Sequence, residues 1–342
     1  MKIIYTDRHH HHATDGLVVE GQPFVYKETP ARAEAILAAV QAARLGLVTP
    51  PADYGLAPLL AVHDADYIAY MRTAYAQNAA YCGATRPLLA GRNGVTLDRA
   101  PHCPADFISR RDYYTYDYED PILEGTWEAA YWSAQCALTA ADFVRRGEPV
   151  AYALCRPPGH HAMPDQYGGF CYLNNVAIAA RSMQAAGPVA ILDIDYHHGN
   201  GTQAIFYADP AVLFCSLHAD PDVDYPFFWG RADEHGEGPG TGLNHNWPLP
   251  LQTDDALYLA ALDEALNTIA DFTPRYLLIS LGLDAAVGDL IGKFHITTAG
   301  FREIGQQIAA LKLPTVIVQE GGYRVETLGE NATAFLRAFV AS

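Results

Sequence analysis

The sequence predicts an α/β fold in which a mostly parallel sheet is covered on both faces by helices. Short apolar runs rich in β-branched residues alternate along the chain with longer segments of helical periodicity, which is typical of strands buried on both faces. The chain has 342 residues and 50% of them are hydrophobic, which is ample for one large buried core. We therefore expect a single α/β domain over residues 1–342.

The elements follow one another in regular order. Six runs are predicted to be buried parallel strands: Lys2–Tyr5, Val150–Leu154, Val189–Ile194, Val212–Leu217, Tyr276–Leu281 and Thr315–Gln319. Five segments have helical periodicity: Ala31–Ala43, Thr126–Arg146, Asn174–Ala186, Asp255–Ala270 and Thr298–Leu311. The first helix follows Thr29 and Pro30, a suitable N-cap and first-turn proline.

Residues 82–125 break this alternation. They contain proline, glycine, arginine and the cluster YYTYDYED, with little periodicity. Connections of this length in a compact domain are usually functional, interfacial or disordered, and the tyrosines argue against disorder. We interpret the segment as a long insertion loop.

Composition restricts the function classes. The net charge of −17 should repel nucleic-acid phosphates, so we expect no nucleic-acid partner. No apolar run approaches the ~20 residues needed to cross a bilayer, so we expect no membrane partner either. The six cysteines show no CxxC spacing and the N-terminus has no signal-peptide pattern, which predicts a cytoplasmic protein. The run His9–His12 resembles an affinity tag, but no linker or cleavage site follows, and we treat it as native.

Two predicted strands end in residues that suit a metal ion. Asp193, Asp195 and His197 follow one strand and share parity, so an extended chain would point them the same way. Asp284 follows another strand. Single aspartates at such positions usually cap helices or bind loop amides, but Asp-x-Asp-x-His before a glycine-rich turn favours a metal site. Two oxygens and one nitrogen leave an open position for water, as in catalytic zinc sites.

A third strand is followed by Glu320-Gly321-Gly322-Tyr323. The two glycines allow a sharp turn that would present the Tyr323 hydroxyl to a developing oxyanion. The alternative is a tyrosine that packs on the surface after an ordinary turn.

His160 and His161 follow the stiff turn Arg156-Pro157-Pro158-Gly159. A tandem histidine in a loop is often a surface accident, but this rigid lead-in favours a pair that acts on metal-bound water. Asp193 and Asn200 could orient the two imidazoles. Together these residues indicate metal-assisted hydrolysis, and the absence of GxSxG and HExxH motifs argues against serine hydrolases and thermolysin-like proteases.

Several blocks resemble the histone deacetylase superfamily: RPPGHH at 156–161, GGFCYLNN at 168–175, DIDYHHGNGTQ at 193–203, SLH at 216–218, LGLDA at 281–285 and EGGY at 320–323. They occur in the family's order. ETPARAEAIL, the 82–125 insertion and EGTWEAA at 124–130 most resemble the bacterial acetylpolyamine amidohydrolases. The resemblance implies an arginase/deacetylase-like fold with an eight-stranded, mostly parallel sheet, and a single deacetylase domain over residues 1–342.

The resemblance also implies roles for individual residues. Asp195, His197 and Asp284 would bind Zn²⁺, with Fe²⁺ able to use the same ligands in the cell. His161 would be the general base and acid, with His160 as its electrostatic partner and Tyr323 bound to the substrate carbonyl. Structural K⁺ ions would use two sets of residues: Asp193, Asp195, His197, Ser216 and Leu217 in one, and Phe206, Asp209, Val212 and Leu243 in the other.

The substrate site would be a narrow tunnel. The resemblance implies that Phe170 and Phe228 form its aromatic walls and that Glu119 binds a distant ammonium group. Leu290, where many relatives have proline, and Ile291 would shape the pocket beside the metal. A second acid of the family is absent near Ile108.

The 82–125 insertion would contact the partner in a homodimer and narrow the tunnel mouth. The expected substrate is then a small cationic acylated amine, an acetylated polyamine or diamine. A protein lysine deacetylase, which would need an open mouth, is the main alternative. An arginase-like binuclear hydrolase is disfavoured because Gly199 stands where a further aspartate would be needed, and an inactive binding module because every ligand and Tyr323 are present.

Overall fold

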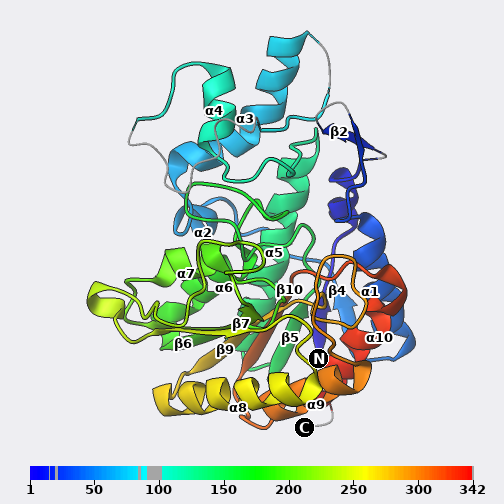
Figure 1. Cartoon of the computed structure of the whole chain (residues 1–342), viewed down its shortest axis with the longest axis vertical. Coiled ribbons are helices and arrows are strands. Elements are labelled where there is room, and N and C mark those ends of the chain that lie inside the picture. The colour runs from blue at the N-terminus through cyan, green and yellow to red at the C-terminus, as the bar shows by residue number, and fades with distance from the viewer. Residues whose placement is uncertain (15, 20–21, 84–85, 91–101, 341–342) are drawn as a thin grey trace.

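An eight-stranded sheet runs through the middle of the protein, with helices on both sides (Figure 1). The computed structural model describes residues 1–14, 16–19, 22–83, 86–90 and 102–340. The strand order is β4-β1-β5-β10-β9-β6-β7-β8, and all neighbouring strands are parallel. The predicted α/β fold with an eight-stranded sheet is thus confirmed.

The six predicted strands are the six inner strands of the sheet. They are β1 (Lys2–Ile4), β5 (Val150–Ala153), β6 (Val189–Asp193), β7 (Val212–Ala219), β9 (Tyr276–Leu281) and β10 (Thr315–Gln319). Every residue of β5, β6, β7, β9 and β10 is buried, which explains their continuous apolar runs. The two edge strands, β4 (Leu47–Thr49) and β8 (Asn244–Leu249), were not predicted.

Two hydrophobic cores lie on opposite faces of the sheet, and successive residues of one strand contribute to different cores. Ala151 and Ala153 face one core, and Tyr152 between them faces the other. The first core includes α3 (Ala65–Cys82), α5 (Thr126–Arg145) and α6 (Asn175–Met183). The second includes α1 (Pro30–Ala42), α8 (Asp255–Phe272), α9 (Thr298–Ala309) and α10 (Val325–Leu336). Short helices complete the fold: α2 (Ala57–Leu60), α4 (Phe107–Tyr113), α7 (Asn200–Phe206), η1 (Asp7–His11), η2 (Gln184–Ala186), η3 (Gly238–Gly240) and η4 (Arg337–Phe339).

The interpretation of 82–125 as a loop without regular structure is wrong in part. Helix α4 lies within it, capped by Asp106, whose Oδ2 accepts the N–H of Ser109 at 3.1 Å. Leu88 and Ile122 form an antiparallel bridge that draws the two ends of the segment together. Residues 84–85 and 91–101 of the insertion lie outside the described residues.

The N-terminal histidine run is integrated in the fold. His9 and His12 are buried, and the Arg156 guanidinium donates to their backbone oxygens at 2.6 and 2.7 Å. The run is followed by the hairpin β2 (Leu17–Val19) and β3 (Gln22–Phe24). In the described part of the chain, no helix is both long and apolar enough to span a membrane.

Candidate active site

Four neighbouring strands carry the candidate residues at their carboxyl ends. Strands β5, β10, β9 and β6 lie side by side in the sheet, and each is followed by one of the motifs singled out in the sequence. Because the strands are parallel, their carboxyl ends meet at one edge, where sites form in such sheets. Segments far apart in the chain are thereby brought together.

Asp195, His197 and Asp284 converge at this edge. His197 Nδ1 lies 3.2 Å from Asp195 Oδ1 and 3.1 Å from Asp284 Oδ2. All three side chains are buried, and their ligand atoms lie within 4.8 Å of one another. Two carboxylate oxygens and one imidazole nitrogen are a donor set suited to a catalytic divalent metal ion. The residues present therefore fit such an ion.

Glycines make room for this cluster. A Cβ atom at Gly282 would lie 2.2 Å from Asp195 Oδ2, and one at Gly321 would lie 2.4 Å from Asp284 Oδ2. Burial, followed by the nearby Asp195 carboxylate, raises the pKa of Asp284 to about 7. Close packing of two carboxylates is a charge arrangement that a cation would stabilise.

The two adjacent histidines have different partners. His160 Nδ1 lies 3.0 Å from Asp193 Oδ2, and His161 Nδ1 lies 2.6 Å from Asn200 Oδ1. Burial opposes protonation of His160, but the carboxylates of Asp195 and Asp193 outweigh it and raise its pKa to about 10. Burial, with His160 and His197 nearby, holds the pKa of His161 well below its usual 6.5. At neutral pH one imidazole is therefore cationic and the other is neutral.

The Glu320 carboxylate binds the backbone of the turn that carries the two histidines, a role that was not predicted from the sequence. Its Oε2 accepts the backbone N–H groups of Gly159 at 2.6 Å and His160 at 3.1 Å. The side chain is fully buried, and burial raises its pKa to about 8. In the sequence, only the glycines and the tyrosine of this motif suggested a role.

Tyr323 is 5% exposed, and burial raises its pKa well above 10, so its hydroxyl remains a hydrogen-bond donor. Two groups hold its backbone and ring. Asp289 accepts the N–H of Tyr323 at 2.8 Å. Arg32 donates to the backbone oxygens of Glu320 (2.6 Å) and Gly322, and its guanidinium lies 4.7 Å from the Tyr323 ring centroid.

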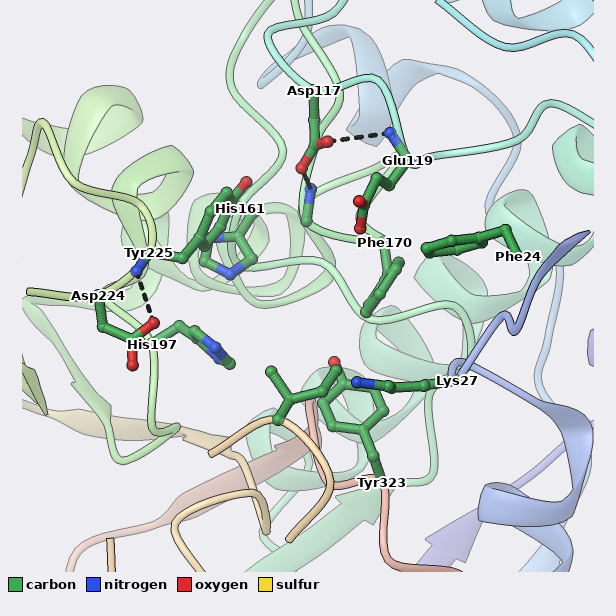
Figure 2. Close-up of a pocket in the computed structure, with 12 residues that line it drawn as sticks. Phe24, Lys27, Asp117, Glu119, His161, Phe170, His197, Asp224, Tyr225 and Tyr323 are labelled. Carbon is green, nitrogen blue, oxygen red and sulfur yellow. Dashed lines mark hydrogen bonds between the residues drawn. The ribbon is translucent and has the colours of Figure 1, made fainter. Parts of the chain in front are cut away.

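Three of these residues, His161, His197 and Tyr323, line a cavity of about 390 Å³ (Figure 2). Its lining consists of Phe24, Lys27, Asp117, Glu119, His161, Gly169, Phe170, His197, Asp224, Tyr225, Ile291 and Tyr323. Phe170, Glu119 and Ile291, which were expected to shape the substrate tunnel, line this cavity, and their contact with substrate stays a prediction. Lys27 and Asp117 were not foreseen there.

Two expected lining residues lie elsewhere. Phe228 is 58% exposed and lines an adjoining hollow with Trp229. Tyr225 takes the wall position instead, with its ring centroid 5.1 Å from that of His161. The expectation for Phe228 is therefore corrected: the turn at 225–228 directs the earlier aromatic residue inward. Leu290 is also 58% exposed and outside the lining.

Phe170 has an unusual backbone conformation. Its φ is +66°, a left-handed value that is costly for a residue with a side chain. Its N–H donates to Asp120 Oδ1 at 2.6 Å, and the preceding Gly169 N–H donates to Asp117 Oδ2 at 3.3 Å. Asp120 is buried, so two acidic residues of the insertion fix this side of the cavity.

Some of the residues expected to bind K⁺ have hydrogen-bond or strand partners within the protein, and their binding of K⁺ stays a prediction. Asp193 and Ser216 are paired across β6 and β7, and Ser216 Oγ lies 2.8 Å from His218 Nδ1. In the second predicted set, the Asp209 carboxylate accepts from Arg181 at 2.5 Å. The Leu243 carbonyl accepts the N–H of Phe214 at 2.9 Å.

Comparisons with known proteins give one consistent result. The family model described as histone deacetylase domain matches residues 26–339. Acetylpolyamine amidohydrolase 1 of Pseudomonas aeruginosa is 45% identical over 341 residues, which cover 99% of each chain. The crystal structure of an acetylpolyamine aminohydrolase from Burkholderia pseudomallei has a TM-score of 0.94 and 41% identity, covering 100% of this chain and 99% of that one. The HDA15 HD domain has a TM-score of 0.81 and 29% identity, covering 100% and 91%.

Proposed function

The chain belongs to the histone deacetylase domain family, and we propose that it hydrolyses the acyl amide bond of acetylated polyamines or diamines. The observation that carries this proposal is the buried cluster of Asp195, His197 and Asp284. It lies beside His161, whose ring centroid is 5.8 Å from that of His197, and both histidines line one cavity. The names of its relatives supply the substrate class.

Asp195, His197 and Asp284 would hold Zn²⁺, or Fe²⁺ in the cell. When bound, such an ion polarises a carbonyl group and lowers the pKa of a bound water. The buried set of two oxygens and one nitrogen supports this assignment.

His161 would act as general base and then as general acid. Its Nδ1–H donates to Asn200 Oδ1, which leaves Nε2 with a free lone pair. That atom would take a proton from the attacking water and deliver it to the departing amine nitrogen. Cationic His160, whose Nδ1 is hydrogen-bonded to Asp193, would stabilise the negative charge that develops on the oxygen of the acyl carbonyl group.

Tyr323 would donate its hydroxyl proton in a hydrogen bond to that oxygen. The hold of Arg32 and Asp289 on the adjacent backbone supports this role, because an oxyanion donor must be positioned before the reaction.

The acidic side of the cavity supports a cationic substrate. Asp117 and Glu119 line it and would attract the free ammonium group of an acetylated diamine or polyamine. Phe170 and Tyr225 would flank the methylene chain. A protein lysine deacetylase is the second candidate, since the same chemistry would serve acetyl-lysine in a peptide.

We also propose the following broader features. Residues 1–342 would form a single deacetylase domain that works as a cytoplasmic homodimer with structural K⁺. The 82–125 insertion would form the dimer contact and the tunnel mouth. Support for the mouth comes from Glu119 and Asp117, which belong to the insertion and line the cavity. Support for K⁺ comes from the adjacent Asp193 and Ser216.

The test compares kcat/KM for N-acetylputrescine, N-acetylcadaverine, N8-acetylspermidine and an acetyl-lysine peptide with metal-loaded enzyme. Preference for the free amines would support the proposal, and preference for the peptide would favour the second candidate. Tyr323→Phe serves as the control for chemistry, and it should lower kcat by about 10²-fold or more because it removes an oxyanion donor.

A further inference from the structure

A tyrosine of the 82–125 insertion lies behind the proposed general base. Tyr116 is buried, and its hydroxyl donates to the backbone oxygen of His161 at 2.8 Å. The same hydroxyl accepts the Nδ2–H of Asn200 at 3.2 Å. Asn200 in turn contacts the ring of His161, with 2.6 Å between Oδ1 and Nδ1. The three residues therefore form a closed ring of hydrogen bonds.

The position of Tyr116 is fixed by its surroundings. Its backbone N–H donates to the backbone oxygen of Tyr167 at 3.3 Å. A Cβ atom at Gly168 would lie 2.4 Å from Cζ of the Tyr116 ring, so this glycine allows the ring to approach. The ring of Trp229 packs edge to face against it, with 5.8 Å between the centroids. These contacts hold the hydroxyl in one place.

The directions of the hydrogen bonds follow from which atoms can donate. A backbone oxygen only accepts, so the hydroxyl proton of Tyr116 is used in the bond to His161. Burial raises the pKa of Tyr116 well above 10, so this proton stays on the oxygen at neutral pH. The Tyr116 oxygen can then only accept from Asn200, whose NH₂ group must face Tyr116 and whose oxygen must face His161. Nδ1 of His161 must therefore carry a proton, which leaves Nε2 as the acceptor.

The reversed amide would give the wrong tautomer. The oxygen and the NH₂ group of an amide are similar in size, so either end of Asn200 fits the same space. If the NH₂ group faced His161, Nδ1 would have to accept and Nε2 would carry the proton. Such an imidazole has no lone pair for the proton of the attacking water. The Asn200 oxygen would also lie against the Tyr116 oxygen, whose proton is directed elsewhere.

We propose that Tyr116 is a positioning residue that fixes the orientation of the Asn200 amide and thereby selects the tautomer of His161 that can act as a base. This inference rests on the proposed function, in which His161 takes a proton from water. It gives the insertion a second role, because the segment would determine the state of the catalytic base besides lining the cavity. Loss of the hydroxyl should therefore slow the chemical step and affect substrate binding little.

The test removes the Tyr116 hydroxyl in two backgrounds, with metal-loaded enzyme and an acetylated diamine, at a pH above the acid limb of each profile. In the wild type, Tyr116→Phe should lower kcat by about tenfold, the effect of losing one hydrogen bond, and should leave KM nearly unchanged. In Asn200→Asp, a carboxylate presents an oxygen to His161 whichever way it is turned. The same substitution should therefore lower kcat there by only about twofold, the limit within which independent changes add.

Tyr67→Phe is the matched control. It also removes a buried hydroxyl that donates to a backbone oxygen, that of Tyr172 at 2.7 Å, and it should leave kcat nearly unchanged. Nuclear magnetic resonance of ¹⁵N-labelled histidine identifies the tautomer without turnover, with His161→Ala to assign the signals. The zinc-loaded wild type should have the proton of His161 on Nδ1, and Tyr116→Phe should have it on Nε2 in part of the molecules.

Three results would overturn the inference. An equal loss of kcat in both backgrounds would show that Tyr116 only anchors the backbone of His161. An unchanged kcat and tautomer in Tyr116→Phe would show that Asn200 keeps its orientation without the hydroxyl. A loss confined to KM would assign Tyr116 to the shape of the cavity. Failure of the wild type to hydrolyse any acetylated amine would refute the proposed function, and the His161 tautomer in the two enzymes would still decide the role of Tyr116.

Discussion

Removal of the Asp289 carboxylate should impair catalysis through Tyr323. Asp289 Oδ2 accepts the N–H groups of Tyr323 at 2.8 Å and Arg324 at 3.0 Å. Its Oδ1 accepts those of Ile291 at 2.9 Å and Gly292 at 3.2 Å. One half-buried side chain therefore connects the loop after the metal-binding segment with the turn that carries Tyr323.

The expected magnitude follows from these four bonds. A hydrogen bond to a charged group contributes about 1.5–3 kcal/mol, and two such bonds hold the Tyr323 turn. Asp289→Ala would therefore remove several kcal/mol of the free energy that keeps this turn in position. A displacement of about 1 Å at a catalytic group can cost about 10²-fold in rate. Asp289→Asn keeps one acceptor oxygen but places an NH₂ group opposite the other two N–H donors, and its loss should be intermediate.

The assay is a double-mutant cycle with Tyr323→Phe, in which kcat, KM and bound metal are measured for each enzyme. If Asp289 acts through Tyr323, Asp289→Ala should lower kcat strongly in the wild type and only weakly in Tyr323→Phe. Bound metal should stay constant. The reasoning is refuted if the two losses multiply fully, or if activity falls only in proportion to lost metal.

Three further predictions concern other parts of the site. Asp120→Ala should raise KM by about tenfold, because it removes the acceptor that holds Phe170 at a costly left-handed φ. Asp120→Asn keeps an acceptor oxygen there and should raise KM less. Equal KM values for the two variants would contradict this role of Asp120. Burial and a neighbouring carboxylate raise the pKa of Asp284 to about 7. Burial opposes protonation of His197, but hydrogen bonds to Asp195 and Asp284 outweigh it and raise the pKa of His197 to about 10. Below pH 7 these ligands must therefore lose protons before metal binds, and metal affinity should fall by about tenfold or more per pH unit there. A flat affinity from pH 5 to 7, measured by competition with a chromophoric chelator, would count against this prediction. Asn200→Asp should raise the pKa of His161, which burial holds below 6.5, because the new carboxylate favours the imidazolium. His161 would then be protonated, and so inactive as a base, up to a higher pH, and the acid limb of the kcat/KM profile should shift to higher pH. An acid limb at the same pH in both enzymes would exclude this coupling.

The strands of the sheet were predictable in proportion to their burial. β5, β6, β9 and β10 are covered on both faces, and the sequence therefore shows uninterrupted apolar runs there. β8 reads NHNWPL and β4 has three residues. Both lie at the edges of the sheet, where polar residues and proline are tolerated because one side of the strand needs no partner. The sequence of β8 therefore carries no strand signal, and β4, which reads LVT, is too short to show a periodic pattern.

The catalytic cluster was predictable because parallel topology brings strand ends together. Asp195, Asp284 and Tyr323 each follow a strand recognisable by its composition, so adjacency in the sheet was enough to group them. Tyr225 and Lys27 follow no such rule. Each is directed into the cavity by an irregular turn or segment whose path depends on contacts with other parts of the chain, and a sequence pattern does not specify such a path.

A buried cluster of charges makes the N-terminal segment part of the catalytic scaffold. Glu28 pairs with Arg32 and, at 2.9 Å, with Arg156. Arg156 begins the turn that carries the two histidines, while Arg32 donates to the backbone on both sides of Gly321 in the Tyr323 turn. One carboxylate thus orders both catalytic turns. Buried ion pairs are weak contributors to net stability because desolvation offsets their attraction. Each guanidinium here also donates to backbone oxygens. The cluster therefore fixes the positions of the two catalytic turns, whereas apolar side chains of equal volume would leave those backbone oxygens without donors.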